Sequence, residues 1–136
     1  EDPALIPNAV EEVLRFDSSQ ISWRRITTKP TVLDGIELPE GTLIFLNFAA
    51  ANRQPDVFED PNIFDIHRSG AHKHISFGKG IHFCLGARMA REEARIVLEV
   101  LTERIPSLNM VAGQKLMTFP NITFRGPERM ELTWDQ

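Results

Sequence analysis

The sequence predicts a mainly α fold with small β-sheets, an α+β class, in a single domain over residues 1–136. Its longest apolar pattern, over residues 87–105, recurs at steps of three and four residues, as in an amphipathic helix. A second helical pattern covers residues 7–16. The β-like segments are short and are bounded by proline and glycine, so we expect small sheets rather than one large sheet.

The first third of the chain is expected to hold one helix and two strands. In residues 7–16, Asn8 is a candidate N-cap and acidic residues are expected in the first turn. Alternating side chains predict a strand within residues 20–28, and Asp34-Gly35 is a turn signal. A second turn at residues 39–41 precedes an apolar, β-leaning run at residues 42–46. Residues 47–52 are predicted to be a short helix or turn.

The rest of the chain divides into an irregular segment, a helix and a hairpin. Residues 53–76, here named the meander, contain prolines and little periodicity, which predicts an extended, irregular path. The helix of residues 87–105 ends at Pro106. The tail alternates loosely around glycine and proline, which predicts a small β-hairpin region. The apolar stripe of the long helix consists of Ala90, Ala94, Val97, Leu101 and Ile105.

Composition excludes several classes of protein. The chain has 136 residues, of which 42% are hydrophobic and 25% charged, with 15 Lys and Arg against 19 Asp and Glu. No apolar run is long enough to span a bilayer, and no basic cluster offers a nucleic-acid surface. The first residues do not read as a signal peptide. Since Cys84 is the only cysteine, no intramolecular disulfide can form, and we expect a cytoplasmic protein.

The most informative stretch is FGKGIHFCLG, residues 77–86, which places Cys84 on a glycine-rich loop before the long helix. A dinucleotide or phosphate loop would need a glycine at position 83, where Phe83 stands. A zinc site could use nitrogen and sulfur ligands, but only one sulfur is present and no ligand frame is complete. A structural cysteine would be a small buried hydrophobe. The zinc candidates are His72, His74, His82 and Cys84.

A fourth interpretation treats Cys84 as an axial thiolate ligand of haem iron. Gly78, Gly80 and Gly86 would let the backbone approach the flat macrocycle without a Cβ clash. The positive end of the following helix would stabilise the sulfur's negative charge. Phe77 would shield the sulfur from water and tune the iron. The glycines favour this interpretation over a structural cysteine, which does not need them.

The stretch FGKGIHFCLG resembles the haem-binding signature F-G-x-G-x-H-x-C-x-G of the cytochrome P450 family. The whole chain, residues 1–136, is similar to the C-terminal, haem-ligating part of such a haem domain. Glu12-Val13-Leu14-Arg15 resembles the family's E-x-x-R helix, in which spacing by three places both charges on one face. The resemblance implies a buried structural ion network of Glu12, Arg15 and Arg68, the last from the meander.

The resemblance also implies haem b as the cofactor, with Cys84 as the fifth iron ligand. Buried haem propionates require cationic or hydrogen-bonding partners. By resemblance these partners are His82 in the signature and Arg25 on the strand after the E-x-x-R helix. Arg24 is adjacent on the opposite face and is the second candidate.

Two segments resemble substrate-facing parts of the family, although either would also suit a core. The first contains Ser19, Ile21 and Trp23, and the second is a hairpin tip with Pro120, Asn121 and Ile122. Past the cysteine, Arg88 and Arg91 either help an electron-donating partner to dock or belong to a solvated helix face.

The implied activity is that of a haem-thiolate monooxygenase, which inserts one oxygen atom from O₂ into a small organic substrate with electrons from NAD(P)H. The implied partners are the N-terminal part of the same haem domain and a reductase or ferredoxin, without nucleic acid or membrane. The chain resembles soluble bacterial members. Residues 44–52 and 119–127 resemble a self-sufficient subgroup whose haem domain is fused to an FMN and iron–sulfur reductase. The alternative function is a haem-binding fragment or sensor without turnover.

Overall fold

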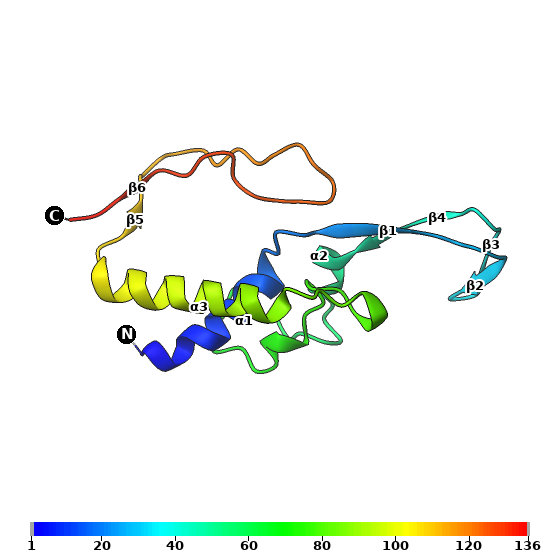
Figure 1. Cartoon of the computed structure of the whole chain (residues 1–136), viewed down its shortest axis with the longest axis horizontal. Coiled ribbons are helices and arrows are strands. Elements are labelled where there is room, and N and C mark those ends of the chain that lie inside the picture. The colour runs from blue at the N-terminus through cyan, green and yellow to red at the C-terminus, as the bar shows by residue number, and fades with distance from the viewer. Residues whose placement is uncertain (1, 136) are drawn as a thin grey trace.

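The computed structural model describes residues 2–135 and confirms the α+β class. Glu1 and Gln136, the two ends of the expected domain, lie outside the described residues. Figure 1 shows α1 and α3 side by side at the centre, with a β-ribbon leading out to one end and the C-terminal segment running along the helices. The helices and strands are α1 (Ile6–Phe16), β1 (Ser22–Ile26), β2 (Thr31–Leu33), β3 (Ile36–Leu38), β4 (Leu43–Asn47), α2 (Phe48–Ala51), α3 (Ala87–Arg104), β5 (Asn109–Met110) and β6 (Leu132–Thr133).

Helix α1 begins earlier than the sequence predicts. Its N-cap position is Leu5, and Pro7 occupies the first turn, where the missing N–H costs no hydrogen bond. The assignment of Asn8 as the cap is wrong, and no acidic residue lies in the first turn. Instead the Asn8 side-chain amide donates to the carbonyls of Ile66, at 2.7 Å, and Arg68, at 3.2 Å. Asn8 therefore ties α1 to the meander.

The β-ribbon is made of two antiparallel pairs joined end to end. Strand β1 pairs with β4 in the register Ser22↔Asn47 to Ile26↔Leu43. Beyond it, β2 and β3 form a hairpin at the far end of the ribbon (Figure 1). Asp34 and Gly35 both have positive φ, 49° and 79°, as a tight type I′ turn requires. The sequence predicts this turn, but the strands that flank it were not predicted.

The C-terminal tail confirms the predicted hairpin region. Strands β5 and β6 pair antiparallel, and an isolated bridge between Thr118 and Pro127 closes the tip of the hairpin. A second bridge joins Gln20, just before β1, to Phe124 in the tail. The tail therefore returns to the start of the β-ribbon, more than a hundred residues earlier in the sequence.

Helix α3 matches the predicted helix and ends at Arg104, with Ile105 as its C-cap before Pro106. Its apolar stripe is only partly covered within residues 2–135, where Val97 remains 53% exposed. Among the helices of this part of the chain, none combines the length and apolar character that crossing a membrane requires.

The interior around α1 is built on charged side chains. Arg15 Nε and Nη2 donate to Glu12 Oε2 and Oε1, each at 2.7 Å, in the forked geometry that strengthens an arginine–carboxylate pair. Arg68 Nε donates to Glu12 Oε1 at 3.1 Å. Glu12 is fully buried and Arg15 is 1% exposed. The structure thus brings together the three residues of the ion network that the resemblance implied.

The two arginines also bind backbone carbonyls of the meander and of Asn52, the residue before it. Arg15 Nη1 donates to the carbonyls of Asn52, at 3.0 Å, and Pro61, at 2.8 Å. Arg68 Nη2 donates to the carbonyl of Ile63 at 2.8 Å. Buried carbonyls outside regular structure need such donors. The ion network therefore holds an irregular segment in place on α1.

We predict that Glu12→Gln costs about 3 to 5 kcal/mol of unfolding free energy, because breaking a buried pair leaves buried arginines without their counter-charge. Denaturant titration of the protein that contains this chain measures the loss. The matched control is Glu92→Gln, which breaks an exposed pair with Arg95 on α3 and should change stability little. Equal effects of the two substitutions would contradict a structural role for the network.

Candidate functional site: the loop around Cys84

The loop of residues 77–86, here named the ligand loop, is shaped by two glycines. Gly78 and Gly80 both have φ of +74°, a region that other residues rarely adopt. Gly86 has φ of −82°, and a Cβ there would lie 3.9 Å from the Cys84 sulfur, an ordinary contact. Within this chain, backbone conformation therefore requires glycine at positions 78 and 80 but not at position 86.

Backbone hydrogen bonds fold the ligand loop back on itself. The Gly78 N–H donates to the Ile75 carbonyl at 2.8 Å, and the Cys84 N–H donates to the Phe77 carbonyl at 2.9 Å. The Ala87 N–H donates to the Cys84 carbonyl at 3.2 Å, which leads directly into α3. Cys84 is exposed within residues 2–135, which does not fit the alternative of a small buried structural cysteine.

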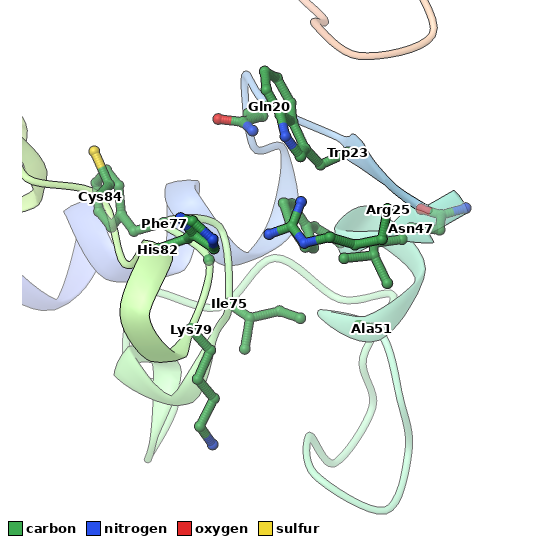
Figure 2. A pocket seen from close by; sticks show the side chains of 13 residues that line it. Gln20, Trp23, Arg25, Asn47, Ala51, Ile75, Phe77, Lys79, His82 and Cys84 are labelled. Atoms are coloured by element: carbon green, nitrogen blue, oxygen red, sulfur yellow. The ribbon is translucent and has the colours of Figure 1, made fainter. Parts of the chain in front are cut away.

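Cys84 is one of the residues that line a hollow of about 750 Å³ between the ligand loop and the β1–β4 pair. Figure 2 shows side chains from both elements around it, with Cys84 and Phe77 towards one end and Asn47 at the other. The lining is mainly apolar and aromatic. Its residues are Gln20, Trp23, Arg25, Leu46, Asn47, Phe48, Ala51, Ile75, Phe77, Gly78, Lys79, His82 and Cys84.

Arg25 and His82 bring positive charge and hydrogen-bond donors to the same hollow (Figure 2). Successive side chains of a strand point to opposite faces, and Arg25 lines the hollow whereas Arg24 does not. Arg25 Nη1 donates to the Arg24 carbonyl at 2.8 Å. Over residues 2–135 no carboxylate forms an ion pair with Arg25. The arginine is thus available to an anionic ligand.

The two segments expected to face substrate lie side by side. The Ile21 N–H donates to the Thr123 carbonyl at 2.8 Å, the Arg125 N–H donates to the Ser19 carbonyl at 2.7 Å, and the Ser22 hydroxyl donates to the Ile122 carbonyl. Of the six expected residues, only Trp23 lines the hollow. Ser19, Ile21, Pro120, Asn121 and Ile122 do not.

The Asn121 side chain folds back onto its own turn. Its oxygen accepts from the N–H groups of Thr123, at 2.7 Å, and Phe124, at 3.0 Å. The Phe124 ring contacts Trp23 edge-on at 6.5 Å between centroids. Asn121 therefore shapes the hairpin tip, while Trp23 connects the tip to the hollow.

Gln20, which lines the hollow, was not predicted.

The zinc alternative is not supported by the arrangement of its four candidates. Within the described part of the chain, no group of three or more His, Cys, Asp or Glu side chains is placed to hold a metal ion. His74 is buried and turned towards α1, where its Nε2 lies 3.1 Å from Glu11 Oε2. His72 is exposed. His74 is thus engaged with α1 rather than with the other zinc candidates.

Sequence reasoning missed a cluster beside the ligand loop, the Glu11 cluster of Glu11, His74 and Arg91. Arg91 Nε donates to Glu11 Oε1 at 2.5 Å and Nη2 donates to Glu11 Oε2 at 3.1 Å. The guanidinium lies over the Phe77 ring, 4.6 Å from its centroid. Arg91 is therefore engaged inside the fold, which contradicts its assignment to a solvated helix face, whereas Arg88 is exposed. The signal in the sequence that could have indicated this cluster is the pair of adjacent acids Glu11 and Glu12.

Burial and charge set the protonation of this cluster. Burial lowers the pKa of His74 below 6.5 despite the nearby Glu11 carboxylate, so the imidazole is neutral at pH 7. Burial raises the pKa of Glu11, but the hydrogen bond and charge of Arg91 outweigh it and leave the pKa below 4.5. The cluster therefore holds one negative and one positive charge around a neutral histidine.

Comparison with known proteins identifies the class to which this fold and site belong. The sequence profile described as Cytochrome P450 matches residues 4–112. Cytochrome P450 105A3 of Streptomyces carbophilus is 40% identical over 98% of this chain and 33% of its own length. Cytochrome P450 monooxygenase PikC of Streptomyces venezuelae is 41% identical over 98% of this chain and 32% of its own length. The chain belongs to the cytochrome P450 family.

A solved structure supports the same conclusion for the fold. An intact type IV self-sufficient cytochrome P450 monooxygenase superposes with a TM-score of 0.95 at 42% identity, over 98% of this chain and 18% of its own. The chain spans about a third of the length of the curated relatives named above. Proteins of this family bind haem b. The hollow fits such a group: its lining is mainly apolar, the Cys84 thiol could bind the iron, and the Arg25 and His82 side chains could bind the two carboxylates of the macrocycle.

We predict an acid-dependent loss of the stability that Glu11 provides. Because its folded pKa lies below 4.5, its contribution is complete above pH 4.5 and is lost as the pH falls through the lowered folded pKa. Unfolding free energies of the haem domain and its Glu11→Gln variant, measured from pH 7 to pH 3, should therefore converge at the acid end. A difference between them that stays constant over this range would contradict the assignment.

Proposed function

We propose that this chain is the C-terminal, haem-ligating portion of the haem domain of a cytochrome P450 monooxygenase. In this proposal the whole protein inserts one oxygen atom from O₂ into a small organic substrate, with electrons from NAD(P)H delivered by a reductase. The observation that carries the proposal is the placement of the Cys84 thiol in one hollow with Arg25 and His82. Membership of the family supports it.

Cys84 is the residue that would bind the iron. Bound haem would supply the activation of O₂, for which a thiolate ligand donates electron density. The ligand loop presents this sulfur in the hollow because the Cys84 N–H is bonded to the Phe77 carbonyl and the loop turns at Gly78 and Gly80. Phe77 is half-buried and lines the same hollow, so with haem bound it would help to shield the sulfur from water.

Arg25 and His82 would bind the two haem propionates. Arg25 comes from β1, whose pairing with β4 fixes the direction of the side chain. His82 comes from the 3₁₀ turn Gly80–His82 in the ligand loop. The two side chains approach the hollow from separate elements, so bound haem would join the β-ribbon to the loop and exclude water between them.

The substrate would lie against the paired segments before β1 and at the hairpin tip. Trp23 reaches the hollow, and the tip that carries Pro120, Asn121 and Ile122 is bonded to the segment that carries Ser19 and Ile21. Ile21, Pro120 and Ile122 are apolar, and Asn121 uses its side-chain oxygen within its own turn, which suits a small organic substrate. Most of the pocket would come from the N-terminal part of the same haem domain.

The electron donor would be a separate reductase or ferredoxin, or a fused FMN and iron–sulfur reductase. Similarity to a self-sufficient monooxygenase, at 42% identity, supports the fused arrangement. The chain is 41% identical to PikC, so sequence identity does not choose between the two arrangements. A cytoplasmic location is part of this proposal. The names of the relatives favour a monooxygenase over a haem-binding fragment or sensor without turnover. Product formation with a reductase would distinguish these two functions.

We predict that Cys84→Ala abolishes the red-shifted ferrous–CO absorption band of the haem domain, because that band requires a thiolate ligand. The measurement is the ferrous–CO difference spectrum. The matched control is Met89→Leu, which removes an exposed sulfur on α3 that does not line the hollow and should leave the band intact. A band that survives in the alanine variant would overturn the assignment of the ligand.

We predict that Arg25→Gln accelerates haem loss by roughly 10- to 100-fold, since a hydrogen bond to a charged group contributes about 1.5 to 3 kcal/mol. Transfer of haem to an excess of a haem-scavenging protein measures the rate. Arg24→Gln is the matched control, because its side chain lies on the other face of β1 and should leave the rate unchanged. Equal rates for the two variants would argue against Arg25 as a propionate ligand.

A further inference from the structure

The Glu11 cluster joins three segments that surround the ligand loop. Glu11 lies on α1, His74 lies three residues before Phe77, and Arg91 lies on α3, seven residues after Cys84. The Glu11 and His74 side chains are 17% and 1% exposed, and Arg91 is 30% exposed. The cluster is thus largely inside the fold, although none of its members lines the hollow.

Hydrogen bonds fix the tautomer of His74. Its Nδ1 accepts from the Ser76 N–H at 3.1 Å, so this nitrogen carries no proton. The proton is therefore on Nε2, which donates to Glu11 Oε2 at 3.1 Å. The same carboxylate accepts two hydrogen bonds from Arg91. Glu11 thereby fixes the orientation of both of its neighbours.

Both neighbours contact the Phe77 ring. The Arg91 guanidinium lies 4.6 Å from the ring centroid, and the His74 ring lies 5.9 Å away with a tilt of 50°. Phe83 contacts Phe77 edge-on at 6.4 Å. A cation over an aromatic face stabilises one orientation of the ring. The Phe77 ring, which lines the hollow, is therefore held by contacts with residues that lie outside the hollow.

We propose that Glu11, His74 and Arg91 are positioning residues for the haem ligand: by fixing the Phe77 ring against the ligand loop, they keep Cys84 bound to iron as a thiolate. This inference rests on the proposed function. Phe77 is bonded to Cys84 through its carbonyl, so a shift of Phe77 reaches the ligand directly. Because the cluster's two charges balance and His74 is neutral, it orients the ring without adding net charge beside the sulfur.

The test uses the complete haem domain and follows the ferrous–CO complex as its thiolate-type band converts to the thiol-type band. Arg91→Met is expected to accelerate this conversion about tenfold, because the ring loses its cation and Glu11 its partner. The matched control is Arg95→Met, which breaks two exposed ion pairs one turn further along α3 without contacting Phe77. Acceleration by less than threefold, or an equal effect of the control, would overturn the proposal.

A double-mutant cycle separates positioning from general stability. If Arg91 acts through Phe77, then Arg91→Met should accelerate conversion by less than threefold in the Phe77→Leu background. A full tenfold effect in that background would refute the mechanism. Should Arg91→Met not fold, Arg91→Gln decides the question: glutamine keeps a planar amide but loses the charge over the ring, so conversion at the wild-type rate would overturn the proposal.

The same spectra distinguish this inference from the proposed function on which it rests. If Cys84 does not bind haem iron, the unmodified domain itself lacks the thiolate-type band, and the proposed function fails. If the unmodified domain has the band and all Arg91 variants convert at its rate, only the positioning role fails.

Discussion

The structure depends on the burial of one carboxylate, Glu12, between two arginines. Three charged groups removed from water would be costly without partners. Here the carboxylate accepts from Arg15, from Arg68 and from the Asp65 N–H. The other N–H groups of the two guanidiniums donate to carbonyls of the meander. These carbonyls lie in a segment without strands or long helices, so the arginines replace the hydrogen bonds that regular structure would provide. The ion network therefore determines where the meander runs.

The ligand loop is attached to that network through polar side chains. Asn52 Nδ2 donates to Ser76 Oγ at 2.7 Å, and Ser76 Oγ donates to the Leu14 carbonyl of α1 at 2.6 Å. The Ile75 N–H donates to Asn52 Oδ1 at 2.8 Å, and the Ile75 carbonyl accepts from Gly78. A continuous chain of hydrogen bonds thus leads from α1 to the turn before Cys84. A disturbance of the α1 network would consequently reach the ligand loop, although the two are far apart in the sequence.

Local patterns predicted what local physics determines. The apolar periodicity of α3, the alternation in β1 and the Asp34-Gly35 turn each depend on neighbours in sequence, and the structure has all three. Predictions failed where a distant partner decides. Asn8 suits an N-cap by type, but carbonyls 58 and 60 residues away bind its amide. His74 was considered as a metal ligand because nothing near it in the sequence indicates Glu11, 63 residues earlier. The sequence motif located the ligand loop, whereas the distant side chains that hold this loop in place became visible only in the structure.

The division between polar interior and apolar surface suits a chain that spans about a third of the length of its relatives. Its largest fully buried side chains are polar, whereas Ile81 and Leu85 of the ligand loop are 97% and 103% exposed. Directional hydrogen bonds hold the backbone without a large apolar core, and apolar side chains on the loop and on α3 remain exposed. If the interior were apolar and the network absent, the exposed faces would compete to fill it. The charged interior therefore gives the ligand loop its conformation independently of the surfaces that it presents.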